Sequence, residues 1–393
     1  MSKQNENPIS AATTTTNTET ALIVNPSSSS GTTGKNWNDF YLKVKEFFGQ
    51  NPEIAFTAKA GDGTSLTREY LQKGFKNIVA IGGDGTINEV ANGFFVSNGV
   101  EENNGNKKKL VKTVVAGGVH SKGDISHSND GINTTNSIIH PPTLRQINPD
   151  AVFGIISSGT RNVLVKSLDL PAESEECCKH YAASKMQKKI DVISATVTNF
   201  PDNDDSDGEN THSKLAPTRI FLNAAEIGVA GEIIDRSKKI RDKVKSRMLS
   251  TVSSVVTTLP TYQSNLCEIS IDDGKESIVT KMTMCVIANG KYLGGGIQAA
   301  PKASMSDGLL DIVILKDSGI FKMLEEFISM KNGNYTSDDQ DIIYMQAKKV
   351  SIKPKEEHKG KKKGDITVTI DGEPIGILPA TFQVYQDALT IKM

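Results

Sequence analysis

The sequence predicts an α/β protein in two parts: an N-terminal domain on a doubly wound, mostly parallel sheet, and a β-rich, sandwich-like second domain. Three observations carry this prediction. Apolar runs alternate with helical periodicity near the N-terminus, a strand, glycine-rich turn and helix follow one another over 78–94, and strand-like runs dominate after residue 190. Strands that alternate with helices are typical of a parallel sheet covered by helices.

The first domain is expected to span 21–168, with Asn25-Pro26 ending its first strand. Its elements alternate between strand and helix, in the order 21–24, 37–48, 54–57, 66–71 and 78–81. The strand at 78–81 is a continuous apolar run, as expected of a strand buried on both faces. A further strand at 152–156 and a helix at 163–168 complete the domain.

Two segments lack such patterning. Residues 1–20 are rich in Thr, Asn and Ser and are predicted to be a disordered tail. Residues 98–149 are polar and glycine-rich, and are predicted to be a flexible insertion within the first domain.

The second domain is expected over 169–378, and the strands in 379–393 are expected to return to the first domain. One long helical stretch, 232–259, interrupts a succession of strands. Those strands are predicted at 190–197, 218–223, 266–271, 281–288, 310–315, 348–352 and 366–370.

Composition excludes several classes of protein. Lys and Arg total 45 against 46 Asp and Glu, a formal net charge of −1, which argues against a nucleic-acid binder. The four cysteines form no CxxC pair, which fits a reducing cytoplasm. No apolar run approaches the ~20 residues that span a bilayer, and the N-terminus lacks the apolar core of a signal peptide.

The turn Gly82-Gly83-Asp84-Gly85-Thr86 is the strongest candidate for chemistry. Glycines let a ligand approach the backbone, and the N–H groups that begin a helix attract anions. Asp84 would repel a bare phosphate, so its presence makes sense if Mg²⁺ lies between them. The alternative is an ordinary strand–turn–helix connection. A similar run, Gly61-Asp62-Gly63-Thr64, is interpreted as a turn in which Thr64 or Ser65 caps the next helix.

This turn resembles the GGDGT signature shared by NAD kinases, phosphofructokinases and diacylglycerol or sphingosine-type lipid kinases. Its continuation through Asn88 and Glu89 resembles the lipid-kinase branch. Further segments resemble the diacylglycerol kinase catalytic family in the same order along the chain: Asn25-Pro26-Ser27, Gly159-Thr160-Arg161-Asn162, 289–296 continuing to 311, and Asp371-Gly372-Glu373.

The resemblance implies an ATP-dependent lipid kinase of the NAD kinase-like superfamily that phosphorylates the hydroxyl of a lipid alcohol. It implies Glu373 as proton acceptor, with Asp84 on the metal side, and Asp371 is expected to converge with these two carboxylates as a third catalytic residue. The nucleotide-binding residues that it implies are Asn25, Pro26, Ser27, Ser28, Thr57, Gly82, Gly83, Asp84, Gly85, Thr86, Asn88, Glu89, Gly159, Thr160 and Asn162.

A second magnesium site, with a structural role, is also implied by the resemblance. Its ligands would be the Asp307 side chain and backbone oxygens of Ser304 and Leu309. Oxygen ligands of this kind suit a hard cation. A plain turn at Asp307 is the alternative.

The chain also departs from the family pattern. Arg161 stands where a small residue is usual, and Val163 stands where diacylglycerol kinases often have Asp. Arg161 could clamp a phosphate or pair with an acid, and both readings stay open. The missing Asp weakens diacylglycerol as the substrate.

Two rival functions remain: a kinase of a soluble alcohol such as NAD, and a non-catalytic regulator that binds nucleotide or lipid. The leading hypothesis places the protein in the cytoplasm, transiently at a membrane surface where it meets its lipid. No nucleic-acid partner is expected, and the oligomeric state, a homodimer included, is left open.

Overall fold

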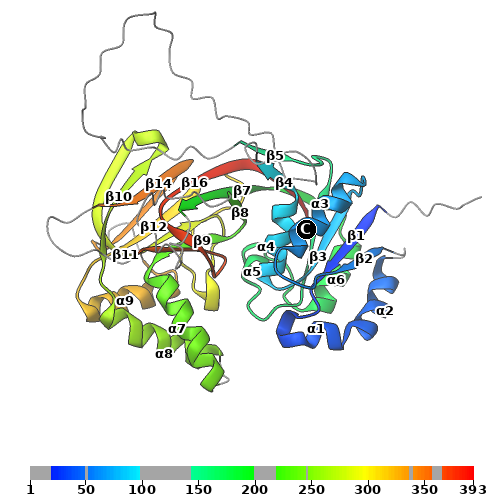
Figure 1. Cartoon of the computed structure of the whole chain (residues 1–393), viewed down its shortest axis with the longest axis horizontal. Coiled ribbons are helices and arrows are strands. Elements are labelled where there is room, and N and C mark those ends of the chain that lie inside the picture. The colour runs from blue at the N-terminus through cyan, green and yellow to red at the C-terminus, as the bar shows by residue number, and fades with distance from the viewer. Residues whose placement is uncertain are drawn as a thin grey trace, which may run out of the picture.

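The computed structural model describes residues 19–48, 52–97, 143–198, 218–244, 247–335, 340–355 and 365–393 (Figure 1). The predicted tail therefore lies outside the described residues except for its last two positions. Most of the predicted insertion, 98–142, also lies outside them.

A parallel sheet forms the N-terminal part of the chain. Its order is β2-β1-β3-β6, and the end of β16 adds a further parallel strand beside β6. Each inner strand is a short apolar run buried on both faces, which suits a parallel sheet covered by helices. The strands are β1 (Thr20–Val24), β2 (Glu53–Phe56), β3 (Asn77–Gly82) and β6 (Val152–Ser157).

Helices pack on both faces of this sheet. On one face, α2 and α6 bring Val44 and Tyr181 against Leu22 and Val79. On the other, α3, α4 and α5 pack on Ile23, Ile78 and Phe153. Helix α6 was not predicted. The bounds are α2 (Trp37–Phe48), α3 (Asp62–Gln72), α4 (Asp84–Gly93), α5 (Val163–Ser167) and α6 (Ser174–Ala183), with the short turns η1 (Ser28–Gly31) and α1 (Thr32–Lys35) before α2.

The C-terminal part is β-rich, as predicted. Its antiparallel strands follow the order β13-β12-β11-β10-β14-β16, and β7, β8, β9 and β15 branch from this path. Their bounds are β7 (Gln187–Thr198), β8 (Arg219–Phe221), β9 (Ala224–Gly228), β10 (Asn265–Ile271), β11 (Glu276–Ala288), β12 (Leu310–Lys316), β13 (Ile342–Ala347), β14 (Lys349–Pro354) and β15 (Thr367–Ile370).

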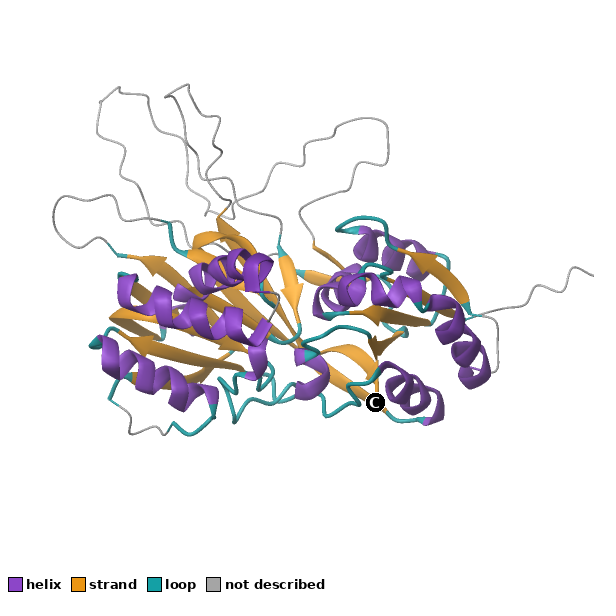
Figure 2. Cartoon of the chain, turned by 90° about the horizontal axis from the view of Figure 1, so that it is seen from below, coloured by secondary structure: helices purple, strands orange, loops and turns teal. Residues whose placement is uncertain are grey.

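Three helices form a layer on this β-rich part (Figures 1 and 2). The long helical stretch expected at 232–259 is two helices, α7 (Val229–Val244) and α8 (Arg247–Thr258), packed against each other. The third helix, α9 (Ile320–Lys331), was not predicted. Short helical turns complete the chain: η2 (Leu259–Thr261), η3 (Asp272–Gly274) and η4 (Gly294–Gly296).

Strand β16 (Glu373–Lys392) links the two parts. It pairs with β15, β14 and β7 along its length, and its last residues pair with β6, where Thr390 lies opposite Val152. The strands expected separately near the C-terminus are thus one strand. Its pairing with β7 shifts register between Tyr385 and Leu389, where Asp387 has a positive φ of 52°.

A small two-stranded sheet brackets residues 98–142. β4 (Phe95–Ser97) pairs antiparallel with β5 (Leu144–Gln146), and Ser97 lies opposite Leu144. Residues 144–146 had been included in the predicted flexible insertion, but they form this strand. The two ends of the insertion are therefore held side by side.

Replacing Phe153 with Ala tests the packing that supports the parallel sheet. Phe153 is fully buried. Its ring contacts the ring of Phe94, the C-cap residue of α4, edge-to-face, with ring centroids 5.5 Å apart. Loss of a buried ring should lower the free energy of unfolding by about 3–5 kcal/mol, measured by denaturant titration. Val279→Ala on β11, at a side chain 47% exposed, is the matched control. Equal effects of both substitutions would contradict the packing described.

Candidate functional site

The GGDGT turn joins β3 to α4. Helix α4 begins at Asp84 with Gly83 as its N-cap residue, so the turn presents backbone N–H groups of a helix start. Gly82 packs tightly: a Cβ there would lie 2.5 Å from Cβ of Thr86. The hydroxyl of Thr86 in turn accepts a hydrogen bond of 2.8 Å from Nδ2 of Asn25.

The turn after β1 is hydrogen-bonded to the glycine turn. Oδ1 of Asn25 accepts a hydrogen bond of 2.9 Å from the N–H of Ser27, and Oγ of Ser28 accepts one of 3.3 Å from the N–H of Gly83. The carbonyl of Pro26 accepts from the N–H of Gly34 at 2.9 Å. The first nucleotide-binding segment predicted from the sequence thus lies against the glycine turn.

The second glycine loop, 157–162, touches the first directly. A Cβ on Gly159 would lie 2.6 Å from the Cα of Gly83, so only glycine fits where the loops meet. Asn162 takes the left-handed conformation, with φ of 50°, at the start of α5. Its Nδ2 donates to the carbonyl of Ala172, while its buried Oδ1 has no hydrogen-bond partner in the described part of the chain. Thr160 is exposed on this loop.

Asp84 connects the two loops. Its Oδ1 accepts hydrogen bonds from the N–H groups of Val163 at 2.9 Å and Leu164 at 3.3 Å, the first residues of α5. Burial raises the pKa of Asp84, and these hydrogen bonds with the positive charge of Arg161 partly oppose that rise. Val163 therefore contributes to the site through its backbone N–H, and this contribution does not depend on its side chain.

Asp371 reaches the first domain from the turn between β15 and β16. It has a positive φ of 49°. Its Oδ2 accepts from Nδ2 of Asn88 on α4 at 2.9 Å, and its Oδ1 accepts from the N–H of Ala224 at 3.2 Å. Burial raises its pKa to about 7, with further contributions from the carboxylates of Asp84 and Glu226.

Glu373 is the first residue of β16 and is exposed. Its Oε1 lies 3.0 Å from where a Cβ on Gly85 would be, so the side chain extends over the first turn of α4. The three predicted carboxylates thus approach the same helix start. Within the described ranges, however, no three side chains among His, Cys, Asp and Glu are close enough to form a metal site by themselves.

A pocket lies where these elements meet. Its polar lining includes two residues that the sequence reasoning missed, Asn223 and Glu226. The complete lining is Asp84, Asn88, Arg161, Val163, Leu164, Leu222, Asn223, Glu226, Gly294 and Asp371.

Glu226 is almost fully buried on β9, where its Oε2 accepts a hydrogen bond of 2.6 Å from Thr369. Burial raises its pKa, which Thr369 and the charge of Arg161 partly oppose. A charged residue inside the apolar run Ala224–Gly228 was the available sequence signal, since buried charges are rare unless partnered.

Arg161 extends from the second glycine loop towards the C-terminal part. Its Nη1 lies 3.2 Å from where a Cβ on Gly372 would be, and 3.6 Å from the same point on Gly294. No hydrogen bond or ion pair joins Arg161 to another residue in the part of the chain that the structure describes. Its charge nevertheless lowers the pKa of both Asp84 and Glu226, so the two roles left open by the sequence, a phosphate contact and pairing with an acid, both stay open.

Of the nucleotide-binding residues predicted from the sequence, Asp84 and Asn88 line this pocket and the others do not. Glu89 accepts hydrogen bonds from the N–H groups of Gly61 at 2.8 Å and Gly63 at 3.0 Å, so it holds the look-alike turn before α3. That helix begins at Asp62 with Gly61 as N-cap, so the prediction of a Thr64 or Ser65 cap was wrong. Thr57 follows β2, and its N–H donates to Val24 at the same end of the sheet.

The predicted second metal site lies in a separate turn before β12. Oδ1 of Asp307 accepts from the N–H of Leu309 at 3.1 Å, which is an ordinary turn contact. The neighbouring Asp191 is buried, and its Oδ2 accepts from the N–H of Gly308 at 2.7 Å. Burial raises the pKa of Asp191, and the charge of Asp307 adds to the rise. Ser304 lies in the same turn.

No helix among the described residues is both long enough and apolar enough to cross a membrane.

Two family models match successive parts of the chain. The model of the diacylglycerol kinase catalytic domain matches residues 19–121, and that of the YegS C-terminal NAD kinase beta sandwich-like domain matches residues 225–393. The diacylglycerol kinase of Bacillus subtilis (strain 168) is 23% identical over 363 residues, which cover 92% of this chain and 91% of that relative. A probable lipid kinase YegS-like from Pectobacterium atrosepticum is 22% identical over 333 residues, 83% of this chain and 81% of the relative.

Solved structures agree in fold. The crystal structure of a diacylglycerol kinase from Bacillus anthracis has a TM-score of 0.58 at 20% identity, covering 95% of this chain and 96% of that one. Another structure from the same organism has a TM-score of 0.61 at 22% identity. The chain thus matches a diacylglycerol kinase catalytic domain followed by a YegS C-terminal domain, and these matches, with its kinase-named relatives, support a lipid kinase, a phosphotransferase.

Proposed function

We propose that this protein transfers the γ-phosphate of ATP to the hydroxyl of a lipid alcohol, diacylglycerol-like or a long-chain base. One observation carries the proposal: the turn Asp371-Gly372-Glu373 brings two carboxylates from the C-terminal part to the glycine turn that begins α4. The same proposal divides the chain into a nucleotide-binding domain at 21–168, a lipid-side domain at 169–378 and a returning strand at 379–393.

The nucleotide phosphates would lie along the two touching glycine loops. The start of α4 offers backbone N–H groups, and the serines of the turn after β1 add hydroxyls, of which that of Ser28 accepts from the N–H of Gly83. Because Gly83 and Gly159 pack without side chains, backbone atoms of both loops can approach one phosphate group.

Magnesium fits the carboxylates here. Asp84 raises the pKa of Asp371, so the two negative charges are close enough to repel, and a divalent cation would relieve this repulsion. Asp84 and Asp371 would hold the ion with phosphate oxygens, since Mg²⁺ commonly uses one or two carboxylates and the substrate's phosphates. When bound, Mg²⁺ neutralises charge on the phosphoryl group.

Glu373 is proposed to accept the proton of the lipid hydroxyl. It is exposed at the helix start, so an incoming alcohol can reach its carboxylate. The hydroxyl oxygen forms the new bond to the γ-phosphorus, the bond from that phosphorus to the bridging oxygen breaks, and ADP leaves. The protein's contribution is mainly positioning and charge stabilisation.

We also propose that Asp307, with backbone oxygens of Ser304 and Leu309, holds a second, structural Mg²⁺. The nearness of two acids, Asp191 and Asp307, supports this because they raise local negative charge. Such an ion would fix the turn before β12.

A transfer assay distinguishes the function from its rivals. The protein is incubated with γ-labelled ATP, Mg²⁺ and a total lipid extract in non-ionic detergent micelles, with NAD and buffer as parallel acceptors. The proposal expects label in an organic-extractable product. Label on NAD would support a soluble-alcohol kinase, and ATP binding without transfer would support a regulator.

Asp84→Asn should bind ATP but lower the transfer rate by about 1,000-fold, because a neutral amide cannot help to hold the metal. ATP binding by calorimetry and turnover by label transfer give the two readouts. The matched control is Asp62→Asn in the look-alike turn, whose carboxylate accepts from the N–H groups of Ala58 and Lys59. Unchanged turnover of Asp84→Asn would refute this role.

The raised pKa of Asp371 predicts a pH dependence. Below about pH 7 its carboxyl is largely protonated and holds a metal poorly, so kcat/KM should rise as the pH increases through 7. Saturating Mg²⁺ should shift that rise to lower pH, since a cation favours the ionised form. Asp371→Asn should have low activity without this rise. A flat profile for the natural protein would contradict the assignment.

Arg161 is proposed to contact the transferring phosphoryl group. Its guanidinium lies among Asp84, Glu226 and Gly372, close enough to affect the pKa of both acids, and no hydrogen bond or ion pair within the described structure holds it. Arg161→Ala should lower kcat by about 100- to 1,000-fold and ATP affinity much less. Added guanidinium ion should restore part of the rate.

The control for Arg161 is Lys166→Ala, an exposed cation on the adjacent helix α5. It should leave kcat unchanged. A fall in melting temperature for Arg161→Ala, with no rescue by guanidinium, would instead indicate a purely structural role.

A further inference from the structure

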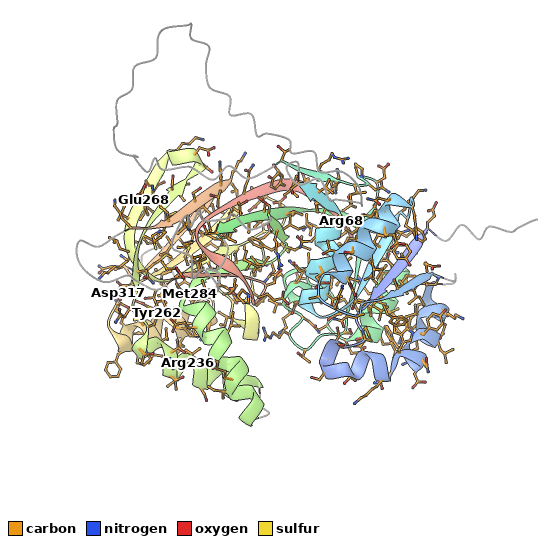
Figure 3. All side chains as sticks on the ribbon, in the orientation of Figure 1. Arg68, Arg236, Tyr262, Glu268, Met284 and Asp317 are labelled. Carbon is orange, nitrogen blue, oxygen red and sulfur yellow. The ribbon has the colours of Figure 1, made fainter. Side chains whose placement is uncertain are left out.

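The helix layer on the C-terminal part has an apolar inner face. Ile233 of α7, Val255 of α8 and Met323 and Phe327 of α9 belong to one buried cluster with strands β9, β11 and β12. Figure 2 looks onto the outer side of this layer, and Figure 3 labels Arg236 on α7. The inner packing fixes which sides of α8 and α9 face solvent.

The outer side of the layer is apolar in places where solvent would normally favour polar residues. Phe321 is 91% exposed and Ile328 is 56% exposed, and they lie seven residues apart, on the same side of α9. Val256 on α8 is 54% exposed. Clustered exposed apolar side chains usually mark an interaction surface.

Positive charge is concentrated on the neighbouring helix. From residue 236 onwards, α7 carries five basic residues and one acid, Asp242, and Arg247 begins α8. The whole chain has a net charge of −1, so this concentration is local. On α9, Lys322 pairs with Asp341 and the acidic Glu325 is exposed, so α9 adds no net positive charge and α7 is the basic helix of the layer. The basic residues of α7 are Arg236, Lys238, Lys239, Arg241 and Lys243.

The layer is connected to the pocket at both ends. Helix α7 follows directly from β9, which carries Glu226 of the pocket lining. The end of α9 accepts a hydrogen bond from Gln298 through the carbonyl of Lys331, and Gln298 lies just after Gly294 of the lining. The layer is thus linked to the pocket through β9 and through the segment 294–298.

We propose that the outer side of α7, α8 and α9 docks on the surface of an anionic lipid bilayer. The exposed apolar side chains enter the interface between headgroups and acyl chains, and the basic half of α7 is attracted to anionic headgroups. The docking itself does not depend on the proposed kinase activity. Only its purpose, which is to bring the pocket to a lipid acceptor, rests on that proposed function. A second copy of the chain is the competing occupant.

Binding to lipid vesicles tests the docking. The full chain is sedimented with vesicles of phosphatidylcholine mixed with phosphatidylglycerol, and with phosphatidylcholine alone. Binding should require the anionic lipid and weaken as salt increases. The double substitution Phe321→Ser with Ile328→Ser should weaken binding by roughly 10- to 100-fold, and Lys239→Glu by roughly tenfold.

The matched control is Leu42→Ser. Leu42 is 67% exposed on α2, on the other part of the molecule, and its replacement should leave vesicle binding unchanged. Equal loss in this control, or full binding by the double variant, would overturn the proposal. If the natural protein is a dimer in gel filtration and the double variant is a monomer that still binds vesicles, the surface would be assigned to a second copy of the chain.

The docking and the catalytic proposal can fail separately. Label transfer to lipid in non-ionic micelles needs no docking on a charged bilayer, so the double variant should keep the rate of the natural protein there. Absence of transfer by both proteins would count against the kinase proposal, while the vesicle result would still decide the docking.

Discussion

The backbone hydrogen bonding of β16 is the constraint on which the arrangement of this molecule depends. The strand begins at Glu373, beside the glycine turn, and ends paired with β6 in the parallel sheet. Between these points it pairs with β15, β14 and β7. A single extended segment thus belongs to both parts, and its paired backbone fixes the distance and direction from one to the other. The position of Glu373 over α4 follows from this pairing more than from contacts of its own side chain.

The pocket combines this rigid frame with an unfavourable concentration of negative charge. Asp84, Glu226 and Asp371 are brought together in a place where burial raises the pKa of each. Such groups destabilise an empty site unless cations or protons offset them. The guanidinium of Arg161 and the N–H groups that begin α5 supply part of the compensation. The remainder suits a ligand that arrives with its own cation, as a nucleoside triphosphate does.

Local patterns in the sequence predicted much of this. Continuous apolar runs located β1, β3 and β6 because strands buried on both faces need them, and the β-rich C-terminal part is confirmed. Patterns failed where a side chain's role depends on distant residues. Helix α9 was missed among strands, and Glu226 was missed because its partner, Thr369, is 143 residues away. Glu89 stands in the motif expected to bind nucleotide, but its carboxylate holds the N–H groups of Gly61 and Gly63.

The small sheet of β4 and β5 makes the length of the segment between them nearly irrelevant to the rest of the fold. Ser97 and Leu144 are paired, so the chain leaves and re-enters the domain at almost one point. The entropy cost of closing a loop between fixed ends grows only with the logarithm of its length. Related chains can therefore gain or lose dozens of residues here at a cost of about 1 kcal/mol, without a shift in the sheet edge that carries the glycine turns. Evolution is free to vary this position, and a reporter domain could be inserted there while the pocket is kept.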